Sequence, residues 1–329
     1  MPNDLTSDNQ LLSRPNAAPC RAAPASAVNC TNQLPDLVAG YVAESLAENT
    51  RRAYLSDLAH FESWGGSLPS SDITLAQYLA SHAETLSVAT LVRRLTSISK
   101  AHEALGYTSP TSSALVRATL RGIKRSQGTA QRKATPLLKE DLISVLDAMG
   151  DTLRDVRDRA LLLVGFAGAF RRSELVALNK SDIGRVRQGI IINLRRSKTD
   201  QTSNGRQVAI PRGRTRFCPV SALDAWLEQS GIRGSAVFRP VNRYGVLSDY
   251  RLSSEAVSLI VKHRIAAMGL DPAAYSGHSL RAGFATSAAR VGVPTWRIRA
   301  QTGHASDAML SKYIRDGRLF KDNAAGALL

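Results

Sequence analysis

The sequence has few of the residues that build metal centres and disulfide frameworks. Its 329 residues include three cysteines, Cys20, Cys30 and Cys218, and none of them belongs to a C-x-x-C pair. Neither a zinc site nor a disulfide framework is therefore indicated. The sequence also lacks an apolar run of the roughly 18 residues that a membrane helix requires. The start MPNDLTSDNQ has neither the basic residues nor the apolar core of a signal peptide. We expect an intracellular protein in a reducing compartment.

Acidic residues are also scarce relative to basic ones. The chain holds 43 Lys and Arg against 27 Asp and Glu, which gives a formal net charge of +16 and a pI near 10.3. Such an excess indicates a polyanionic partner, with nucleic acid as the first candidate and an anionic membrane as the second. An incidentally basic protein is the alternative that charge alone leaves open.

Signals for nucleotide or metal cofactors are missing as well. The sequence has no G-x-x-x-x-G-K-[ST] loop, so ATP is not implied. Metal-dependent cleavage of DNA needs clustered carboxylates, and the one candidate cluster alternates with arginines. We interpret it as a surface face joined by salt bridges, and we expect no metal and no cofactor. The aspartates are Asp151, Asp155 and Asp158, and the arginines are Arg154, Arg157 and Arg159.

Composition and periodicity divide the chain into four segments. Residues 1–34 are rich in Ala, Pro, Ser and Asn without a period, and we predict that they are disordered. Residues 35–128 carry helical patterns almost throughout and form the first predicted domain. A polar, basic linker is expected over 129–135, and a second domain over 136–329.

The helices of the first domain combine apolar stripes with basic faces. Tyr54, Leu58 and Phe61 fall at i, i+4 and i+7. A second stripe runs through Val88, Leu91, Val92, Leu95 and Ile98. Residues 108–138 hold six Lys and Arg and no Asp or Glu, and like charges at i, i+4 repel unless they meet phosphates. A solvated surface is the alternative. The candidate DNA-contact residues here are Arg51, Arg52, Arg93, Arg94, Lys100, Arg117, Arg121, Lys124 and Arg125.

The second domain mixes helices with a β-hairpin. The segment RDRALLLVGFAGAF is apolar nearly all round and predicts a buried central helix. Further on, apolar residues recur with a period of two on both sides of a polar turn, which is typical of a hairpin with a longer loop. Residues 185–216 carry nine Lys and Arg against one acid, Asp200. We expect this hairpin to lie along a phosphate backbone through Arg195, Arg196 and the turn residue Lys198.

Four short motifs carry residues suited to chemistry on a phosphodiester. Each one alone has an ordinary explanation, such as a structural salt bridge for R-x-x-E, a solvated turn lysine or a satisfied core histidine. Together, and in this order, they point to one anionic site. The residues are Arg171 and Glu174 in FRRSEL, Lys198 in RRSKTD, His278 and Arg281 in GHSLRAG, and His304 and Tyr313 in GHASDAMLSKY.

These motifs resemble those of the tyrosine site-specific recombinases, the phage integrase family. The resemblance covers roughly residues 35–320, and ENTRRAYLSDLAHFESW looks like the start of the family's core-binding domain. It implies a mostly α-helical protein with a small β-sheet or hairpin in the catalytic domain. It also implies two domains, a helical core-binding domain and a mixed α+β catalytic domain, that form a C-shaped clamp on DNA. The first 34 residues look too short for an arm-site-binding domain of the lambda type, which favours the simple Cre/Xer-like type.

The chemistry assigns a role to each residue. Two guanidiniums, Arg171 and Arg281, hold non-bridging phosphate oxygens in a fixed fork geometry. Tyr313 has a reference pKa of roughly 10 and needs a base to become a nucleophile, for which we choose His278.

The remaining roles follow from the resemblance and from charge. The resemblance gives protonation of the departing 5′ oxygen to Lys198. We expect His304 to donate a hydrogen bond to the phosphate. Glu174, an anion beside an anion site, is expected to orient His278 or Arg171.

The resulting hypothesis is an enzyme that cleaves and rejoins DNA through a 3′-phosphotyrosine, without metal or ATP. Its expected partner is double-stranded DNA with inverted half-sites. The protein would bind as a dimer on each site and a homotetramer on two, with an accessory protein as an open question. We expect it in the cytoplasm of a bacterium or as a phage product, at the nucleoid. Two alternatives stay open, a type IB topoisomerase-like activity and a DNA-binding accessory protein without catalysis.

Overall fold

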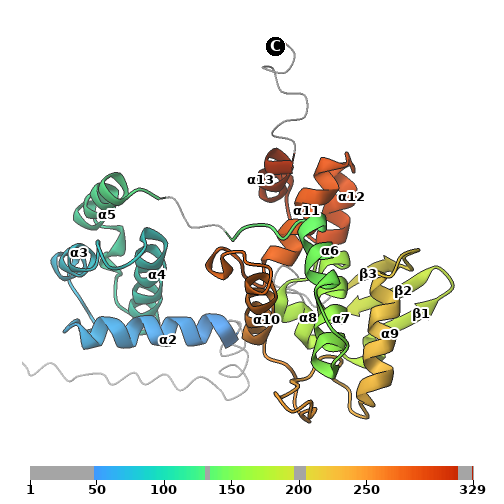
Figure 1. Ribbon diagram of the computed structural model, residues 1–329. Coiled ribbons are helices and arrows are strands. Elements are labelled where there is room, and N and C mark those ends of the chain that lie inside the picture. Colours follow the sequence, from blue (N-terminus) through green and yellow to red (C-terminus); the bar gives the residue numbers. More distant parts are fainter. Residues whose placement is uncertain (1–47, 130–133, 196–204, 318–327, 329) are drawn as a thin grey trace, which may run out of the picture. The chain divides into compact units, whose positions relative to one another are not determined.

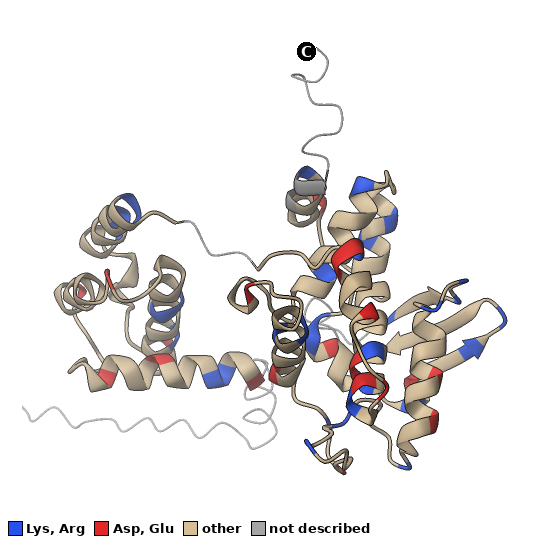
Figure 2. Cartoon of the chain, in the orientation of Figure 1, with Lys and Arg blue, Asp and Glu red and all other residues tan. Residues whose placement is uncertain are grey.

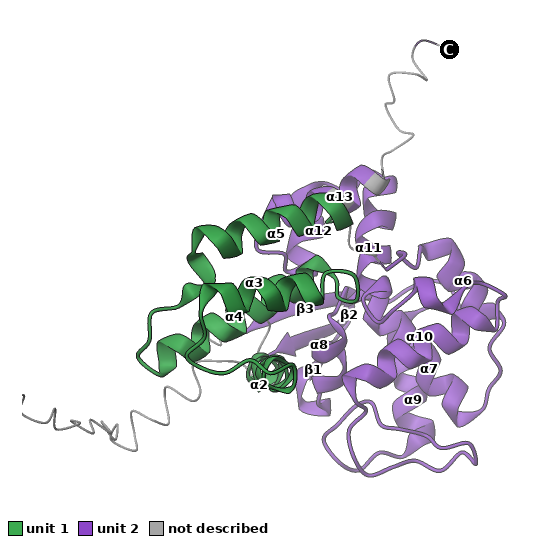
Figure 3. Cartoon of the chain, turned by 90° about the vertical axis from the view of Figure 1, so that its left-hand side faces the viewer, with its two compact units in different colours: residues 1–131 green, residues 132–329 purple. Residues whose placement is uncertain are grey.

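The computed structural model describes residues 48–129, 134–195, 205–317 and 328. The expected disordered segment 1–34 and residues 318–327 of the tail lie outside the described residues. The chain divides into two compact units, Met1–Gln131 and Arg132–Leu329 (Figures 1 and 3). The model is mostly helical with one small sheet, which confirms the predicted fold class. The clamp-like arrangement of the two domains stays a prediction.

Unit 1 is a helical bundle. Helix α2 contacts α4, and α3 contacts α5. Serines at the helix starts accept hydrogen bonds from backbone N–H groups two or three residues further on, which satisfies donors that a helix leaves free. The elements are α2 (Glu48–Ser63), α3 (Asp72–Ser81), α4 (Val88–Ala104), the short 3-10 turn η1 (Pro110–Ser112) and α5 (Ala114–Gln127).

The stripe predicted on α4 is wrong at one turn. Leu91, Leu95 and Ile98 are buried as expected, but Val92 is 39% exposed and Arg94 is only 8% exposed. Arg94 donates to the hydroxyl of Tyr78 at 2.9 Å and lies 2.8 Å from Nδ1 of His60. A buried guanidinium needs acceptors around it, and these are supplied from inside unit 1. Arg94 is therefore a structural residue and is withdrawn as a DNA contact.

The buried carboxylate of Asp57 is the centre of this polar network. Asp57 is 1% exposed and accepts two hydrogen bonds from Arg93, at 2.7 and 3.0 Å, and one from the hydroxyl of Ser97 at 2.8 Å. The Arg94 Nε lies 3.6 Å from it. One carboxylate thus joins helices α2 and α4 where periodicity alone predicts only apolar contact.

The other predicted DNA contacts of unit 1 are exposed but differ in their partners. Arg51 and Arg52 form ion pairs with Glu48, and Lys100 pairs with Glu103. Figure 2 shows the basic positions along α5. The α5 residues, all exposed, are Arg117, Arg121, Lys124 and Arg125.

Unit 2 packs helices around a central helix and one face of a three-stranded sheet. Helix α7 is buried over most of its length, as predicted from its apolar sequence. The elements are α6 (Lys139–Asp147), α7 (Leu153–Ala167), α8 (Arg172–Ala177), η2 (Lys180–Asp182), β1 (Ile183–Val186), β2 (Gly189–Leu194), β3 (Arg206–Pro211), α9 (Pro219–Ser230), α10 (Ser254–Ala266), η3 (Pro272–Ala274), α11 (Ser279–Arg290), α12 (Thr295–Thr302) and α13 (Asp307–Gly317).

The predicted hairpin is confirmed as β2 paired antiparallel with β3. Ile190 lies opposite Ile210 and Ile192 opposite Val208, and all four are buried. Strand β1 pairs with the other edge of β2 and is missing from the sequence prediction. Its burial pattern explains this, because only Ile183 is partly buried and the next three residues are exposed.

The aspartate cluster is salt-bridged as predicted, but its centre is not at the surface. Asp158 is 2% and Arg157 5% exposed. Arg264 of α10 binds both Asp155 and Asp158, at 2.7 and 2.6 Å. This partner lies about 100 positions away in the sequence, which is why a local pattern fails to find it. Within the part of the chain that the structure describes, no group of three His, Cys, Asp or Glu is placed to hold a metal, and no helix is long and apolar enough to cross a membrane.

Asp57 provides a test of the unit 1 network. Asp57→Asn removes the charge that balances two arginines and is expected to destabilise unit 1 by about 3 kcal/mol, the low end for breaking a buried ion pair. Hydrogen exchange of α4 amides in the full chain measures this. Glu103→Gln, which removes the charge from an exposed carboxylate paired with Lys100, should leave α4 exchange unchanged. Equal exchange in both variants would show that Asp57 has no such role.

Candidate active site

The nucleophile candidate and its base candidate lie within hydrogen-bond distance. The Tyr313 hydroxyl on α13 is 2.8 Å from Nε2 of His278, the residue before α11. With the imidazole proton on Nδ1, Nε2 accepts the phenol proton. The two residues are 35 positions apart in the sequence, and the packing of α13 on α11 brings them together.

Arg281 lies in the same helix as predicted, one turn after His278. It is 1% exposed, and its Nη1 donates to the backbone oxygen of Ala169 at 2.8 Å. Ala169 follows α7 and has a φ of +49°, an unusual left-handed conformation for a residue with a Cβ. This turn directs a carbonyl group at the guanidinium. Among the described residues, Arg281 Nη2 has no hydrogen-bond acceptor, so this buried donor is available to an incoming anion.

Arg171 and Glu174 form a close pair at the start of α8. Glu174, 4% exposed, accepts from the guanidinium of Arg171 at 2.5 Å and from its backbone N–H at 2.9 Å. Of the two partners that we expected for Glu174, the structure places it on Arg171. The Glu174 carboxylate thus satisfies one of the N–H groups that the start of a helix otherwise leaves free.

His304 lies in a turn between α12 and α13. It is 8% exposed, and its Nδ1 is 2.7 Å from the hydroxyl of Thr302, which is fully buried. The His304 ring centre is 5.9 Å from that of Tyr313. The turn thus brings a second imidazole beside the tyrosine.

Burial and the cations of the site lower the pKa of both histidines. Burial, followed by the charges of Arg281, Arg171 and Arg172, lowers the pKa of His278. Burial, followed by the charges of Arg281 and Arg171, lowers the pKa of His304 to about 4. Burial and the neighbouring Arg171 lower the pKa of Arg281 to about 10, which leaves it charged at neutral pH. A neutral His278 is the form that can accept a proton.

The predicted lysine cannot be placed. Lys198 and Arg196 lie outside the described residues, in the connection between β2 and β3. Arg195 is described at the end of β2, where it donates to Asp182 at 2.7 Å and to the hydroxyl of Ser181. A DNA-contact role for Arg195 requires an exchange of that carboxylate for a phosphate.

Sequence reasoning missed one partly buried cation in this cluster, Arg206. It begins β3 and lies 3.9 Å from Glu174. A signal exists in the sequence, because Arg206 shares the core-facing register of β3 with Val208 and Ile210. An arginine at an inward position of an amphipathic strand points to a buried anion or helix end.

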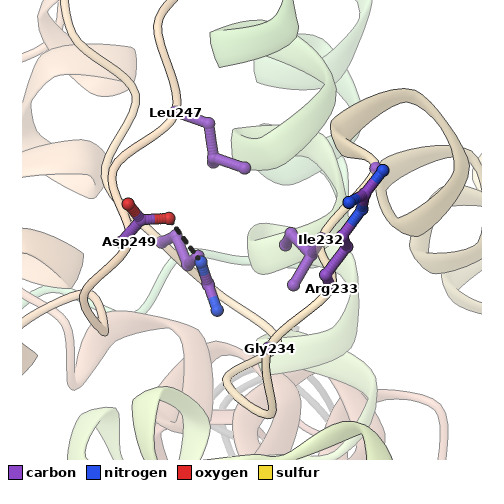
Figure 4. Close-up of a pocket in the computed structure, with 7 residues that line it drawn as sticks. Ile232, Arg233, Gly234, Leu247 and Asp249 are labelled. Atoms are coloured by element: carbon purple, nitrogen blue, oxygen red, sulfur yellow. Dashed lines mark hydrogen bonds and ion pairs between the residues drawn. The ribbon is translucent and has the colours of Figure 1, made fainter.

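A surface pocket lies elsewhere in unit 2 and contains none of these residues. It has a volume of about 400 Å³ and is lined by residues between Gly231 and Asp249 (Figure 4). Its buried Arg239 pairs with the exposed Asp249 at 3.5 Å. A hollow of this kind suits a small molecule, whereas a duplex is bound on an open surface.

Comparison with known proteins shows the family of the chain. The family model described as phage integrase family matches residues 136–318, which is more than half of the chain. The chain is 40% identical over 291 residues to the integrase/recombinase xerD homolog of Selenomonas ruminantium, covering 85% of each protein. The chain belongs to the phage integrase family. It is a tyrosine recombinase of the Cre/Xer type, and it is 27% identical to recombinase cre of Escherichia phage P1, covering 75% of each protein.

Solved structures of recombinases share this fold. A XerH site-specific recombinase in a post-cleavage complex with palindromic difH substrate matches with a TM-score of 0.60 and 20% identity, over 85% of this chain and 78% of that one. A lambda integrase dimer bound to a COC′ core site matches with a TM-score of 0.61 and 20% identity, over 85% of this chain and 94% of that one. At such identities the similarity supports the fold of the chain.

The pKa of His304 predicts how stability depends on pH. Its value in the folded protein is about 4, below the unfolded value of roughly 6.5. The unfolded chain therefore binds more protons between these values, and stability falls as the pH is lowered through this window. Urea unfolding is measured at pH 7 and at pH 5, with hydrogen exchange of the α7 amides as the probe. The loss of stability between the two pH values should be smaller in His304→Gln than in the wild type. An equal loss in both proteins would contradict the assignment.

Proposed function

We propose that this chain is a site-specific DNA recombinase that cuts and rejoins strands through a covalent bond between Tyr313 and a DNA 3′ phosphate. The 2.8 Å contact between the Tyr313 hydroxyl and His278 Nε2 is the observation that supports this most directly. This contact supports Tyr313 as the nucleophile and His278 as its base, beside the guanidiniums of Arg171 and Arg281.

Cleavage consists of one substitution at phosphorus. The Tyr313 oxygen forms a bond to the scissile phosphorus while the bond from phosphorus to the 5′ oxygen breaks. His278 takes the phenol proton, and Lys198 gives a proton to the departing 5′ oxygen. Ligation reverses these transfers when a 5′ hydroxyl from the partner strand attacks the phosphotyrosine. The phosphodiester energy is kept in that bond, so the cycle needs no ATP.

The arginines stabilise the charge that develops on the non-bridging oxygens during attack. Arg281 is held by Ala169 and Arg171 by Glu174, so both guanidiniums are fixed before DNA arrives. Such preorganised donors stabilise a transition state without reorganisation, and the loss of one costs on the order of 10²–10³ in rate. His304 is the further donor to the phosphate, and DNA binding would raise its pKa because an anion favours the protonated form.

We infer that double-stranded DNA is the partner. Two observations support this inference. The chain has a net charge of +16, and recombinases that share its fold are bound to DNA, one of them as a dimer on a core site. A dimer on inverted half-sites follows by analogy. Exchange between two duplexes cuts four strands, so we propose a tetramer. The exposed basic face of α5 is the proposed contact with the phosphate backbone in unit 1. An enzyme with this substrate acts where genomic DNA lies, at the nucleoid.

Covalent trapping tests the nucleophile. With a substrate nicked next to the cleavage site, the short 5′-hydroxyl fragment diffuses away and the covalent complex accumulates. Wild-type protein should form an adduct that resists denaturant, and Tyr313→Phe should form none. An adduct in Tyr313→Phe would overturn the assignment.

A second assay uses purified protein and DNA with two marked sites. It separates recombination from relaxation by a topoisomerase, and it tests whether an accessory protein is needed.

The role of Lys198 as the acid has its own test. Lys198→Ala should slow adduct formation on normal DNA by about 10²–10⁴, the range for a lost general acid. A substrate with sulfur in place of the 5′ bridging oxygen leaves as a thiolate, which needs no proton, and should restore most of the rate. Arg281→Ala is the matched control, because its loss is not repaired by a better leaving group. Failure of sulfur to rescue Lys198→Ala would exclude the acid role.

A further inference from the structure

Arg206 connects β3 to the end of α12. Its Nη1 donates to the backbone oxygens of Gln301 at 2.6 Å and of Ala300 at 3.3 Å. These carbonyls belong to the last turn of α12, where a helix has no acceptor partners of its own and a cation is favourable. Gln301 strengthens the connection from the other side, since its Nε2 donates to the backbone oxygen of Ala209 in β3 at 3.2 Å.

The guanidinium of Arg206 also packs against the residue before His304. Gly303 has a φ of +64°, and a Cβ added there would lie 2.8 Å from Cζ of Arg206. Its backbone oxygen faces Nη2 of Arg171 at 3.5 Å. The Gly303 backbone is therefore contacted by two guanidiniums, and a side chain at this position would push one of them away.

The same two arginines are neighbours of one carboxylate. Glu174 binds Arg171 at 2.5 Å, while Nη2 of Arg206 lies 3.9 Å from it and forms no hydrogen bond to any residue in the described part of the chain. Arg206 is thus attracted to Glu174 by charge. Only 20% of its side chain is exposed and Nη2 is buried, so it points into the protein and is poorly placed to contact DNA.

We propose that Arg206 is a positioning residue of the cleavage reaction, which fastens the end of α12, and with it His304, to the Arg171–Glu174 pair. This inference about Arg206 rests on the proposed function. Arg206 thereby holds two groups that act on the same phosphate, Arg171 and His304, at a fixed separation.

The charge of Arg206 gives the proposal an independent readout. The groups that act on the pKa of His304 are Arg281, Arg171, His278 and Arg206, and all four lower it. The Thr302 hydroxyl and the Tyr313 ring are its other neighbours. Burial and the other three charges lower this pKa more than Arg206 does, so removal of Arg206 should raise the pKa of His304 slightly above about 4.

The experiment compares Arg206→Gln and Arg206→Lys with the wild type. Under single-turnover conditions with saturating nicked DNA, Arg206→Gln should form the Tyr313 adduct about 10–100 times more slowly, since a misplacement of about 1 Å costs up to 10² in rate. The Kd for DNA should stay within about twofold, because Arg206 does not face the duplex. Arg206→Lys keeps the charge and one carbonyl contact, and should recover part of the rate.

NMR titration of the His304 ring in DNA-free protein is the second measurement. The His304 pKa should rise in Arg206→Gln and stay near the wild-type value in Arg206→Lys. Arg299→Gln is the matched control, because Arg299 also lies on α12 but pairs with the exposed Asp307, and it should change neither the rate nor the titration.

The possible results distinguish a failure of this proposal from a failure of the proposed function. A slower rate with an unchanged His304 titration would reduce Arg206 to a general stabiliser of the fold, and a shifted titration with an unchanged rate would exclude a role in cleavage. Either result overturns the proposal. If the wild type forms no Tyr313 adduct, the proposed function itself fails, and the titration still decides whether Arg206 acts on His304.

Discussion

Repulsion among cations around one carboxylate is the interaction on which the catalytic unit depends. Arg171, Arg206 and Arg281 surround Glu174, and the pKa values of Arg206 and Arg281 are both lowered by burial and by the neighbouring guanidinium of Arg171. One negative charge balances three positive ones only in part. The negative charge of a phosphodiester would balance more of this positive charge. An anion that binds among these guanidiniums lowers the free energy of their mutual repulsion.

Separate elements of the fold supply this cluster. The turn after α7 provides the acceptor for Arg281, the first turn of α8 provides Glu174, and the last turn of α12 provides carbonyls for Arg206. Helix ends recur here because their free N–H and carbonyl groups bind side chains without disturbing a core. The apolar face of β2 and β3 and the buried length of α7 keep these ends together. The chemistry is therefore placed by packing that has no chemical function itself.

Sequence patterns predict the elements better than the contacts between them. The burial of α7, the β2–β3 hairpin and the grouping of Arg171, His278, Arg281, His304 and Tyr313 follow from periodicity and motif order. Local patterns fail where a polar side chain is buried by a distant partner. Arg94 looks like a surface cation until Tyr78 and Asp57 are placed beside it, and Asp158 looks exposed until Arg264 is.

Two further misses have different causes. Strand β1 escapes because three of its four residues are exposed, which leaves no apolar period to detect. The role of Arg206 is not predicted because its inward position in β3 can be interpreted only when the end of α12 is known to lie next to it. Neither fact can be obtained from a short window of sequence, since both depend on which elements become neighbours.

The left-handed turn at Ala169 has a consequence for how this protein tolerates mutation. A non-glycine residue with this backbone conformation costs about 1–3 kcal/mol and persists only when its surroundings enforce it. Here the enforcing contacts are hydrogen bonds from the turn back to the end of α7, to Phe166 and Gly165. A substitution that loosens the packing of α7 would let the turn relax and rotate the Ala169 carbonyl away from Arg281. Such a variant would remain folded and bind its substrate while losing turnover. We therefore expect residues of the hydrophobic core that hold this turn to influence the catalytic rate.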